Sequence, residues 1–288
     1  MGWWADGVCR AGGIIKGAYD DPRKLGGHPL FVASTNGCYV TDVDGNEYVD
    51  FANHHTTTIL GHTPPTVMEA VRASLDDGLA FGHASSLEAE ITAELASRVP
   101  SVEKVRFTNS GTESSLHVCR MARAITGKQK IAKFEGQCKR RSSLPVLLPK
   151  PQRSCGADHG SHDSVEWSVG PASDANGPAS SPLPAPSVAG MPDAMADLVV
   201  ILPWDLEEAE AILRADDDVA AVFYEGNLAS ALELPGGVAK HCAEVRALTA
   251  ELGVLMVMDE VVCFRASHAG FQGPTPSPNL AQPLLRSW

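Results

Sequence analysis

The chain has 288 residues, 44% of them hydrophobic, and its 35 acidic and 23 basic residues give a formal net charge of −12. This length suits one large α/β domain or two smaller ones, and the negative charge argues against a nucleic-acid or anionic-membrane partner, which needs clustered positive charge. Seven cysteines without a C-x-x-C pair argue against a disulfide framework or a thiolate zinc site. No segment has the composition of a signal peptide or reaches the roughly 18 apolar residues of a membrane span, so we expect a cytoplasmic protein.

The first predicted element is a β-hairpin between Tyr39 and Phe51. Residues that favour strands lie on both sides of Asp44-Gly45, a dipeptide that suits the positive φ angles of a tight turn. The acidic residues around this turn partly match a calcium-binding loop. However, Gly45 stands at the fourth position of such a loop instead of the sixth, and the closing glutamate is missing. The pattern therefore favours a plain hairpin.

Two amphipathic helices are predicted next, each introduced by a capping box. Thr66 with Glu69 begins the first, and Ser85 with Glu88 begins the second. Apolar residues recur at helical spacing in both: Val67, Val71 and Leu75 in the first, and Leu87, Ile91, Leu95 and Val99 in the second. Gly78 and Pro100 are expected to end them.

From residue 105 onward, short apolar runs alternate with helical patterns. We predict strands at 105–107, 131–134, 198–202, 219–224 and 254–258, and helices at 110–125, 207–213 and 240–252. The last strand, VLMVM, is apolar on both faces, as expected for a central strand of a parallel sheet that is covered by helices on each side. The fold class is therefore α/β, with a mostly parallel sheet flanked by helices.

Two stretches do not fit a compact domain. Residues 171–192 contain six prolines among Ser, Ala and Gly, a composition that buries too little apolar surface to order itself, so we expect a mobile surface loop. Residues 138–157 are also aperiodic, and structureless loops of this length are uncommon inside a domain.

The first candidate site is the segment NSGTE at 109–113, where a predicted strand ends and a helix begins. Backbone N–H groups and the positive end of the helix dipole converge there, and the hydroxyls of Ser110 and Thr112 add donors, so the segment suits a phosphate group. Ser and Thr are also ordinary N-cap residues. On this segment alone, capping is the more common role.

The second candidate site is Asp259-Glu260, at the carboxyl end of the strand 254–258. Parallel sheets place their ligands at this edge, and a carboxylate there can pair with a pyridinium nitrogen and keep it protonated. The same pattern occurs on the magnesium-binding strand of P-loop ATPases. That alternative needs a G-x-x-x-x-G-K-[ST] segment, and the best candidate, TGKQ at 126–129, lacks both the first Gly and the hydroxyl.

Several longer motifs occur in one order: DVDGNEYVDF, ILGHTPPTVMEAV, VRFTNSGTESSLHVCRMARAITGKQKIAKFEG, AAVFYEGN and LGVLMVMDEVVCFR. Together they resemble class-III pyridoxal 5'-phosphate (PLP) aminotransferases of the glutamate-1-semialdehyde aminomutase type, over residues 25–137 and 158–272. The resemblance implies the fold type I of PLP-dependent transferases and amino-group transfer on a small amino-acid or keto-acid substrate. It also implies a homodimer.

The resemblance further implies which residues form the cofactor site. Ser110, Gly111 and Thr112 would surround the phosphate, Asp259 would pair with the ring nitrogen, Val261 would lie against the ring, and His159 and Glu225 would lie near the cofactor. Glu225 is followed by Gly226 where the family has Pro. Lys16 stands where relatives often have an arginine for a substrate carboxylate, although lysine lacks the bidentate fork of arginine.

One departure from the family pattern lies at 138–157. In the family, the motif KFEG runs almost directly into Tyr-His-Gly, whose aromatic ring stacks on the cofactor. Here residues 138–157 intervene and Asp158 replaces the tyrosine. If Cys138 is encoded by TGT and Asp158 by GAC, removal of the intervening bases joins T to AC and gives TAC, a tyrosine codon. We therefore interpret 138–157 as a translated, unspliced intron. Cys155, His159 and His162 are an alternative set of metal ligands. A tetrahedral site usually has four ligands, so we expect no metal.

The other departure concerns the lysine that forms the Schiff base in the family. The last lysine of the sequence is Lys240, before Asp259, so the sequence predicts that this catalytic residue and the C-terminal small domain are missing. The expected division is an N-terminal segment at 1–60, an incomplete PLP-binding domain at 61–272 and an aberrant tail at 273–288. Three alternatives remain: an active aminotransferase, a catalytically inactive relative, and a different α/β nucleotide-binding module.

Overall fold

The computed structural model describes residues 30–51, 53–135, 159–169, 176–178, 180–226, 234, 236–272 and 285–287. Lys16 and the segment 138–157 lie outside these residues. The chain divides into two compact units, Met1–Ser85 and Ser86–Trp288, and this boundary falls later than residue 60 because α3 belongs with the N-terminal unit. No helix in the described ranges is long and apolar enough to cross a membrane.

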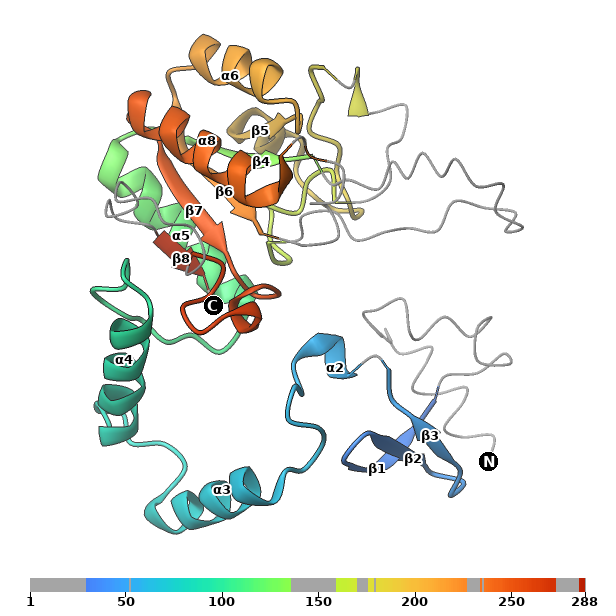
Figure 1. The fold of residues 1–288 in the computed structure, drawn as a ribbon. Coiled ribbons are helices and arrows are strands. Elements are labelled where there is room, and N and C mark those ends of the chain that lie inside the picture. Colours follow the sequence, from blue (N-terminus) through green and yellow to red (C-terminus); the bar gives the residue numbers. More distant parts are fainter. Residues whose placement is uncertain are drawn as a thin grey trace. The chain divides into compact units, whose positions relative to one another are not determined.

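The N-terminal unit contains a three-stranded antiparallel sheet in the order β1-β2-β3 (Figure 1). Its strands are β1 (Val32–Asn36), β2 (Tyr39–Asp42) and β3 (Glu47–Val49). The predicted hairpin is confirmed as β2 and β3, and Gly45 in its turn has a φ of 86°, a backbone conformation that favours glycine. The strand β1, which pairs with β2, was not predicted from the sequence.

The described part of this unit also contains the helices α2 (Asn53–Thr56) and α3 (Pro65–Asp77). The first predicted helix is thus confirmed, but its predicted cap is wrong. The N-cap is Pro64, with no side-chain hydrogen bond, and not Thr66. Pro65 begins the helix because its fixed φ is already helical and its missing N–H would have had no acceptor there. The backbone N–H of Gly78 ends the helix by donating to Leu75 O.

The second unit is built around a parallel sheet in the order β5-β4-β6-β7-β8 (Figure 1). Its strands are β4 (Lys130–Phe134), β5 (Val199–Leu202), β6 (Val219–Glu225), β7 (Leu255–Asp259) and β8 (Leu285–Ser287). Four of the five predicted strands are confirmed. Residues 105–107 are not a strand, since no described strand pairs with them, and an isolated extended segment gains no ladder hydrogen bonds.

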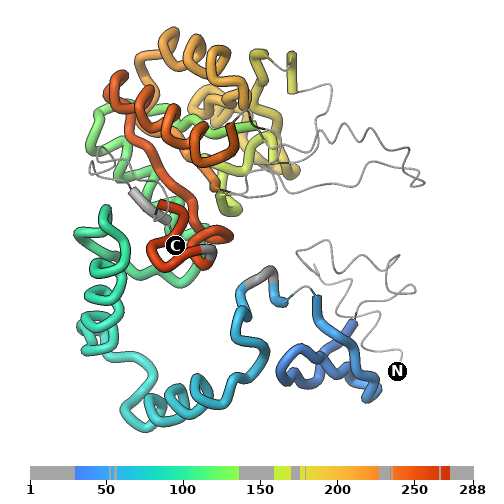
Figure 2. The backbone as a smooth tube through the Cα atoms, in the orientation of Figure 1, coloured from blue at the N-terminus to red at the C-terminus, as the bar shows by residue number. Residues whose placement is uncertain are grey.

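Among its described residues, this unit has the helices α4 (Ser86–Arg98), α5 (Gly111–Thr126), α6 (Leu206–Ala215) and α8 (Gly237–Glu251). Two short 3-10 helices, η2 (Asp193–Leu198) and η3 (Phe264–Ala266), precede β5 and follow β7. The end of α4 is tied to the chain beyond η3, because Arg98 Nε donates to His268 O at 2.8 Å and Ser101 Oγ donates to Gln272 Oε1 at 2.8 Å. Figure 2 shows the backbone of these elements as a tube.

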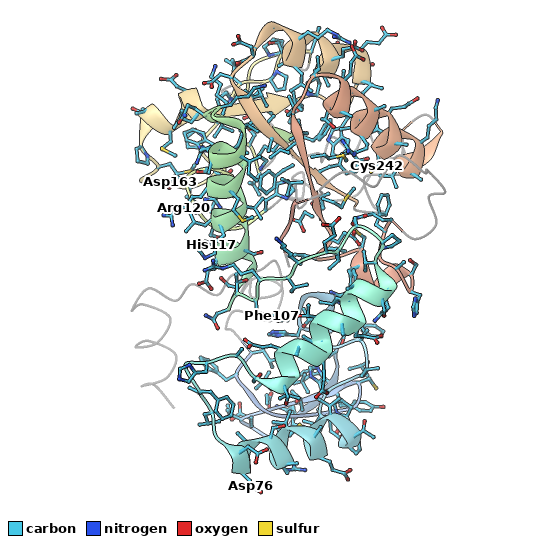
Figure 3. All side chains as sticks on the ribbon, turned by 90° about the vertical axis from the view of Figure 1, so that its left-hand side faces the viewer. Asp76, Phe107, His117, Arg120, Asp163 and Cys242 are labelled. Atoms are coloured by element: carbon cyan, nitrogen blue, oxygen red, sulfur yellow. The ribbon has the colours of Figure 1, made fainter. Side chains whose placement is uncertain are left out.

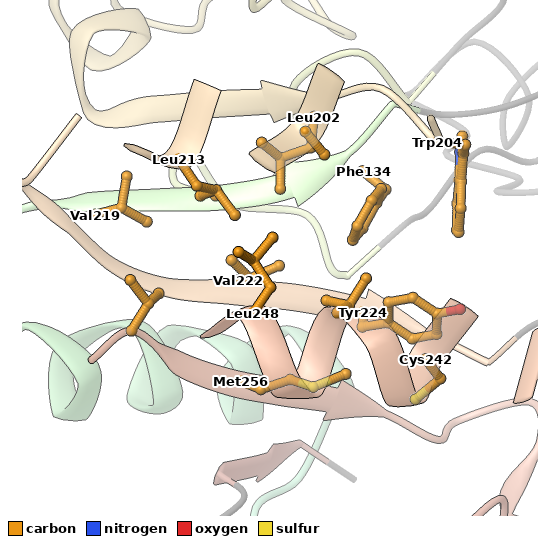
Figure 4. Close-up of a cluster of buried hydrophobic side chains, with 14 of the residues drawn as sticks. Phe134, Leu202, Trp204, Leu213, Val219, Val222, Tyr224, Cys242, Leu248 and Met256 are labelled. Carbon is orange, nitrogen blue, oxygen red and sulfur yellow. The ribbon is translucent and has the colours of Figure 1, made fainter. Parts of the chain in front are cut away.

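The sheet separates two hydrophobic cores because side chains alternate across each strand. On one face, Ala132 and Phe134 of β4 and Val222 and Tyr224 of β6 pack with residues of α6 and α8 (Figure 4). On the other face, Ile131 and Phe223 pack with residues of α5 and with Val165. The expected architecture, a parallel sheet flanked by helices, is confirmed.

A segment without regular secondary structure, residues 159–169, lies on the α5 face of the sheet. Val165 and Trp167 are buried within it. Part of the proline-rich stretch 171–192 is tied to this segment: Ser168 N donates to Ala185 O at 2.7 Å, and Trp167 forms a β-bridge with Pro186. The described residues 180–187 are therefore hydrogen bonded to the fold at several points, and the mobility of the stretch stays a prediction.

Candidate functional site

The N-terminus of α5 is formed by the predicted segment NSGTE. Ser110 is the N-cap, and its hydroxyl accepts from Glu113 N at 3.1 Å, while Glu113 Oε2 accepts from Asn109 N at 2.8 Å. Ser110 therefore has its ordinary role as the N-cap, and the Glu113 carboxylate binds the backbone N–H of the residue before the cap. By helix geometry the N–H groups of Gly111 and Thr112 have no acceptor within the helix, so the positive end of α5 keeps donors for an anion.

The carboxyl end of β7 carries Asp259, which is buried. Its Oδ2 lies 2.8 Å from His159 Nδ1, and its Oδ1 accepts from Val261 N at 3.0 Å. Because a carboxylate only accepts, Nδ1 of His159 carries the proton. The side chain of His159 has no exposed surface, and its Nε2 has no hydrogen-bond partner among the described residues. A buried polar atom without a partner marks a place where a further polar group fits.

The residues after His159 lie on the first turn of α5. Ser161 N donates to Thr112 Oγ1 at 3.1 Å. Gly160 has a φ of 118°, and a Cβ added there would come within 2.8 Å of Ser115 Oγ and 2.9 Å of Thr112 Cα. Only glycine lets the chain pass this close to the helix. The segment that supplies His159 to Asp259 therefore also contacts the helix terminus.

His162 makes the next contact with α5. Its Nε2 lies 3.0 Å from Ser115 Oγ, and its Nδ1 accepts from Ser164 N at 3.3 Å. Nε2 therefore carries the proton and donates to Ser115, whose own hydroxyl donates to Thr112 O at 3.1 Å. Burial lowers the pKa of His162 to about 4, with a smaller contribution from the positive charges of nearby Arg123 and Arg120. His162 is thus a neutral side chain that links the segment 159–169 to α5 by a hydrogen bond. Figure 3 labels Arg120 on α5.

Three further residues lie at or just beyond the carboxyl ends of the central strands, two of them acidic. Glu225, the last residue of β6, is paired in register with Asp259. Val261 is 47% exposed, so its side chain is available to a bound molecule. Glu260 points elsewhere, because its carboxylate accepts from Phe271 N at 2.8 Å and from Gln272 Nε2 at 2.9 Å. Asp259 and Glu260 are adjacent in sequence, yet they bind partners in different segments.

The structure brings Asp259 and His159 into direct contact and places Ser110, Gly111 and Thr112 together at the start of α5. Sequence reasoning missed Ser115 and Ser161, for which no local signal exists. It also missed Lys133, although a lysine between apolar residues of a buried strand, KIAKF, is unusual. The two histidines considered as metal ligands contact different partners, and the described residues hold no group of three or more His, Cys, Asp or Glu side chains placed to bind a metal.

Comparison with known proteins identifies the family. Residues 22–267 match the family model for aminotransferase class-III. The chain belongs to the class-III aminotransferase family. Among curated relatives, it is 32% identical over 93% of its length to glutamate-1-semialdehyde 2,1-aminomutase from Desulfitobacterium hafniense, and 31% identical over 90% of its length to the enzyme of that name from Methanococcus maripaludis.

Solved structures of the class-III aminotransferase family share the fold. An omega-transaminase from Sphaerobacter thermophilus covers 92% of this chain at 32% identity, with a TM-score of 0.72, and 59% of that protein is matched. A glutamate-1-semialdehyde aminomutase from Pseudomonas aeruginosa covers 86% of this chain at 26% identity, with a TM-score of 0.68 and 48% of that protein matched. The chain spans 57% and 55% of the two curated relatives. The mostly parallel sheet is thus that of the PLP-dependent transaminases.

Proposed function

We propose that this chain binds PLP between the N-terminus of α5 and the carboxyl end of β7, and that it serves amino-group transfer. The observation that carries the proposal is the buried His159–Asp259 pair, which is joined through Gly160 and Ser161 to the first turn of α5. One short segment thereby links a candidate phosphate site to a candidate partner for a ring nitrogen. Family membership supports the same function.

The donor set fits this cofactor. Thr112 Oγ1 accepts from Ser161 N, so its own hydrogen remains available for a phosphate oxygen, and the N–H groups at the start of α5 suit the same anion. Asp259 receives one hydrogen bond on each oxygen, and a carboxylate has roughly four lone-pair sites, so it can accept a third donor from a pyridinium nitrogen. Val261 would lie against the ring and Glu225 near it.

PLP, when bound, supplies an electron-accepting ring, and the ring accepts electrons best when its nitrogen is protonated. In this proposal Asp259 holds that proton on the nitrogen, and His159 holds Asp259 in place by donating from Nδ1. The first turn of α5 orients the cofactor by its phosphate. A small amino acid and a keto or aldehyde acceptor are the proposed substrates. Lys16 remains a candidate for the substrate carboxylate, and the homodimer and cytoplasmic setting stay predictions.

A second candidate function is cofactor binding without covalent attachment. Two of the described lysines, one on β4 and one on α8, support it, because their ammonium groups bind other partners. Lys133 Nζ donates to Val165 O and Trp167 O, and Lys240, on the exposed side of α8, lies 3.5 Å from Glu244. Neither lysine is placed to react with a bound aldehyde.

Titration of the full chain with PLP, followed by absorbance, tests the first point, with ADP as the probe for a general nucleotide-binding module. Saturable binding of PLP without binding of ADP is expected. Absence of a saturable absorbance change would remove the proposed function. Borohydride reduction and peptide mapping then separate the two candidates: a pyridoxyl group linked to a lysine supports amino-group transfer by this chain, and bound cofactor that is released on denaturation supports noncovalent binding.

A further inference from the structure

Lys133 is a fully buried lysine in the middle of β4, on the face of the sheet that packs against α5. Its Nζ donates to Val165 O at 2.8 Å and to Trp167 O at 2.9 Å. Burying an ammonium group is unfavourable unless hydrogen bonds compensate for the lost water. An apolar side chain of the same length, such as methionine, would fill this position without that penalty. The lysine therefore supplies something that packing alone does not.

What it supplies is a fixed backbone position in the segment 159–169. The two carbonyls that it binds are two residues apart, so both point toward the sheet. Trp167 Nε1 donates to Asp163 O at 2.6 Å, and Val165 N and Glu166 N donate to His162 O at 3.0 and 3.1 Å. These bonds make residues 162–167 a compact turn with Lys133 beneath it.

The other end of the same turn continues into the candidate site. His162 Nε2 bonds to Ser115 on α5, Ser161 N bonds to Thr112, and His159 bonds to Asp259. Only six positions separate His159 from Val165. A shift of the turn away from Lys133 would therefore move the imidazole of His159 relative to Asp259. Displacements of about 1 Å in a functional site can have large effects on binding and reactivity.

We infer that Lys133 is a positioning residue for the cofactor site: by holding the carbonyls of Val165 and Trp167 it sets the place of His159 against Asp259 and of Ser161 against α5. The expected effect on PLP binding rests on the proposed function. The expected effect on the backbone of 159–167 does not depend on it. The competing explanation is that burial of Val165 and Trp167 holds the segment without help from the lysine.

The test compares Lys133→Met with Lys130→Met, in the full chain. Lys130 is on the same strand, but it lies at the partly exposed start of β4 and its Nζ bonds to Asp216 at 2.7 Å. Two quantities are measured in each variant: amide hydrogen exchange in peptides that cover 159–167, and PLP affinity with the absorbance maximum of the bound cofactor. The absorbance maximum reports the surroundings of the ring and does not change when only the folded fraction falls.

Lys133→Met is expected to speed exchange in 159–167 about tenfold, to weaken PLP binding about tenfold and to shift the absorbance maximum. Lys130→Met is expected to change the exchange rates in 159–167 and the PLP affinity by less than about twofold. Equal behaviour of the two variants overturns the inference. If Lys133→Met does not fold, Lys133→Gln replaces it, because its side chain is one atom shorter than that of lysine but keeps N–H donors. This variant must raise exchange in the same peptides, and unchanged exchange there overturns the inference. If the wild-type chain binds no PLP, the proposed function fails, while the exchange comparison still decides the role of Lys133.

Discussion

Asp42 of the three-stranded sheet and Asp259 of the parallel sheet are both buried carboxylates that accept several hydrogen bonds, but the donors come from different distances along the chain. Asp42 accepts from the N–H of Asp44, from the N–H and side-chain amide of Asn46 and from the Tyr48 hydroxyl, all within six residues. Asp259 accepts from Val261 N and from His159, which is 100 positions away.

This difference separates a structural carboxylate from a candidate functional one. The bonds to Asp42 close the hairpin on itself, and the side-chain amide of Asn46, with further hydrogen bonds from its neighbours, lowers the pKa of Asp42. Asp259 instead joins two segments that have no local reason to meet, at the ligand-binding edge of the sheet. A buried acid that joins distant segments depends on the whole fold. We therefore expect substitutions at Asp259 and its partners to affect function.

The largest expected effect comes from Gly160, which follows the Asp259 partner His159, and it is compared with Gly45 in the turn that Asp42 closes. Gly160→Ala should destabilise the second unit by roughly 2–4 kcal/mol, because it combines a positive φ with a clash against the backbone of Thr112. Gly45→Ala, in the hairpin turn, also has a positive φ but meets nothing within 4 Å, so about 1 kcal/mol is expected. Denaturant unfolding measures both. Equal losses would show that Gly160 is not pressed against α5.

Asp259→Asn tests the functional side of the comparison. It keeps the size of the side chain but removes the charge that would hold a protonated ring nitrogen. PLP affinity should fall between roughly tenfold and a hundredfold, since a hydrogen bond to a charged group contributes about 1.5–3 kcal/mol. Absorbance titration measures it, and Asp42→Asn is the matched control. A loss of affinity in the control of similar size would show that the two aspartates do not differ as described.

Asp42→Ala tests the structural side. It removes the acceptor of hydrogen bonds from Asp44, Asn46 and Tyr48, and leaves these donors without their partner. Amide exchange in the peptides of β2 and β3 should accelerate about tenfold, while exchange in α5 stays as in the wild type. Faster exchange in both regions would contradict the view that the hairpin is closed by its own residues.

The smallest expected effect is a pH dependence from His162. Its pKa is about 4 in the folded chain, below the ordinary value of 6.5, so the unfolded chain binds its proton more readily. The contribution to stability is complete above pH 6.5, declines as the pH falls from 6.5 to 4, and is constant below that. Because the ring is partly exposed, the loss should be about 1 kcal/mol. His162→Gln should remove this part of the pH profile, and an unchanged profile would rule out His162 as its source.

Much of the fold could be predicted from the sequence because its signals are local. The Asp44-Gly45 turn, the N-cap at Ser110 and the apolar run of β7 each depend on neighbouring residues, and each forms as predicted. The failures are instructive for the same reason. The strand expected at 105–107 lacks a paired neighbour among the described strands. The helix α3 begins at Pro65, before the capping box that was predicted at Thr66.

By itself the sequence determined the alternation of strands and helices, the two ends of the candidate site at α5 and β7, and the motifs of the class-III aminotransferase family. Only the tertiary structure decided that His159 reaches Asp259, that Gly160 must pass against Thr112, and that a buried lysine holds the turn between them. These contacts join residues that are about 30 to 100 positions apart. Hydrogen bonds over such separations depend on how the strands are ordered and how the segments pack, which no local pattern of residues specifies.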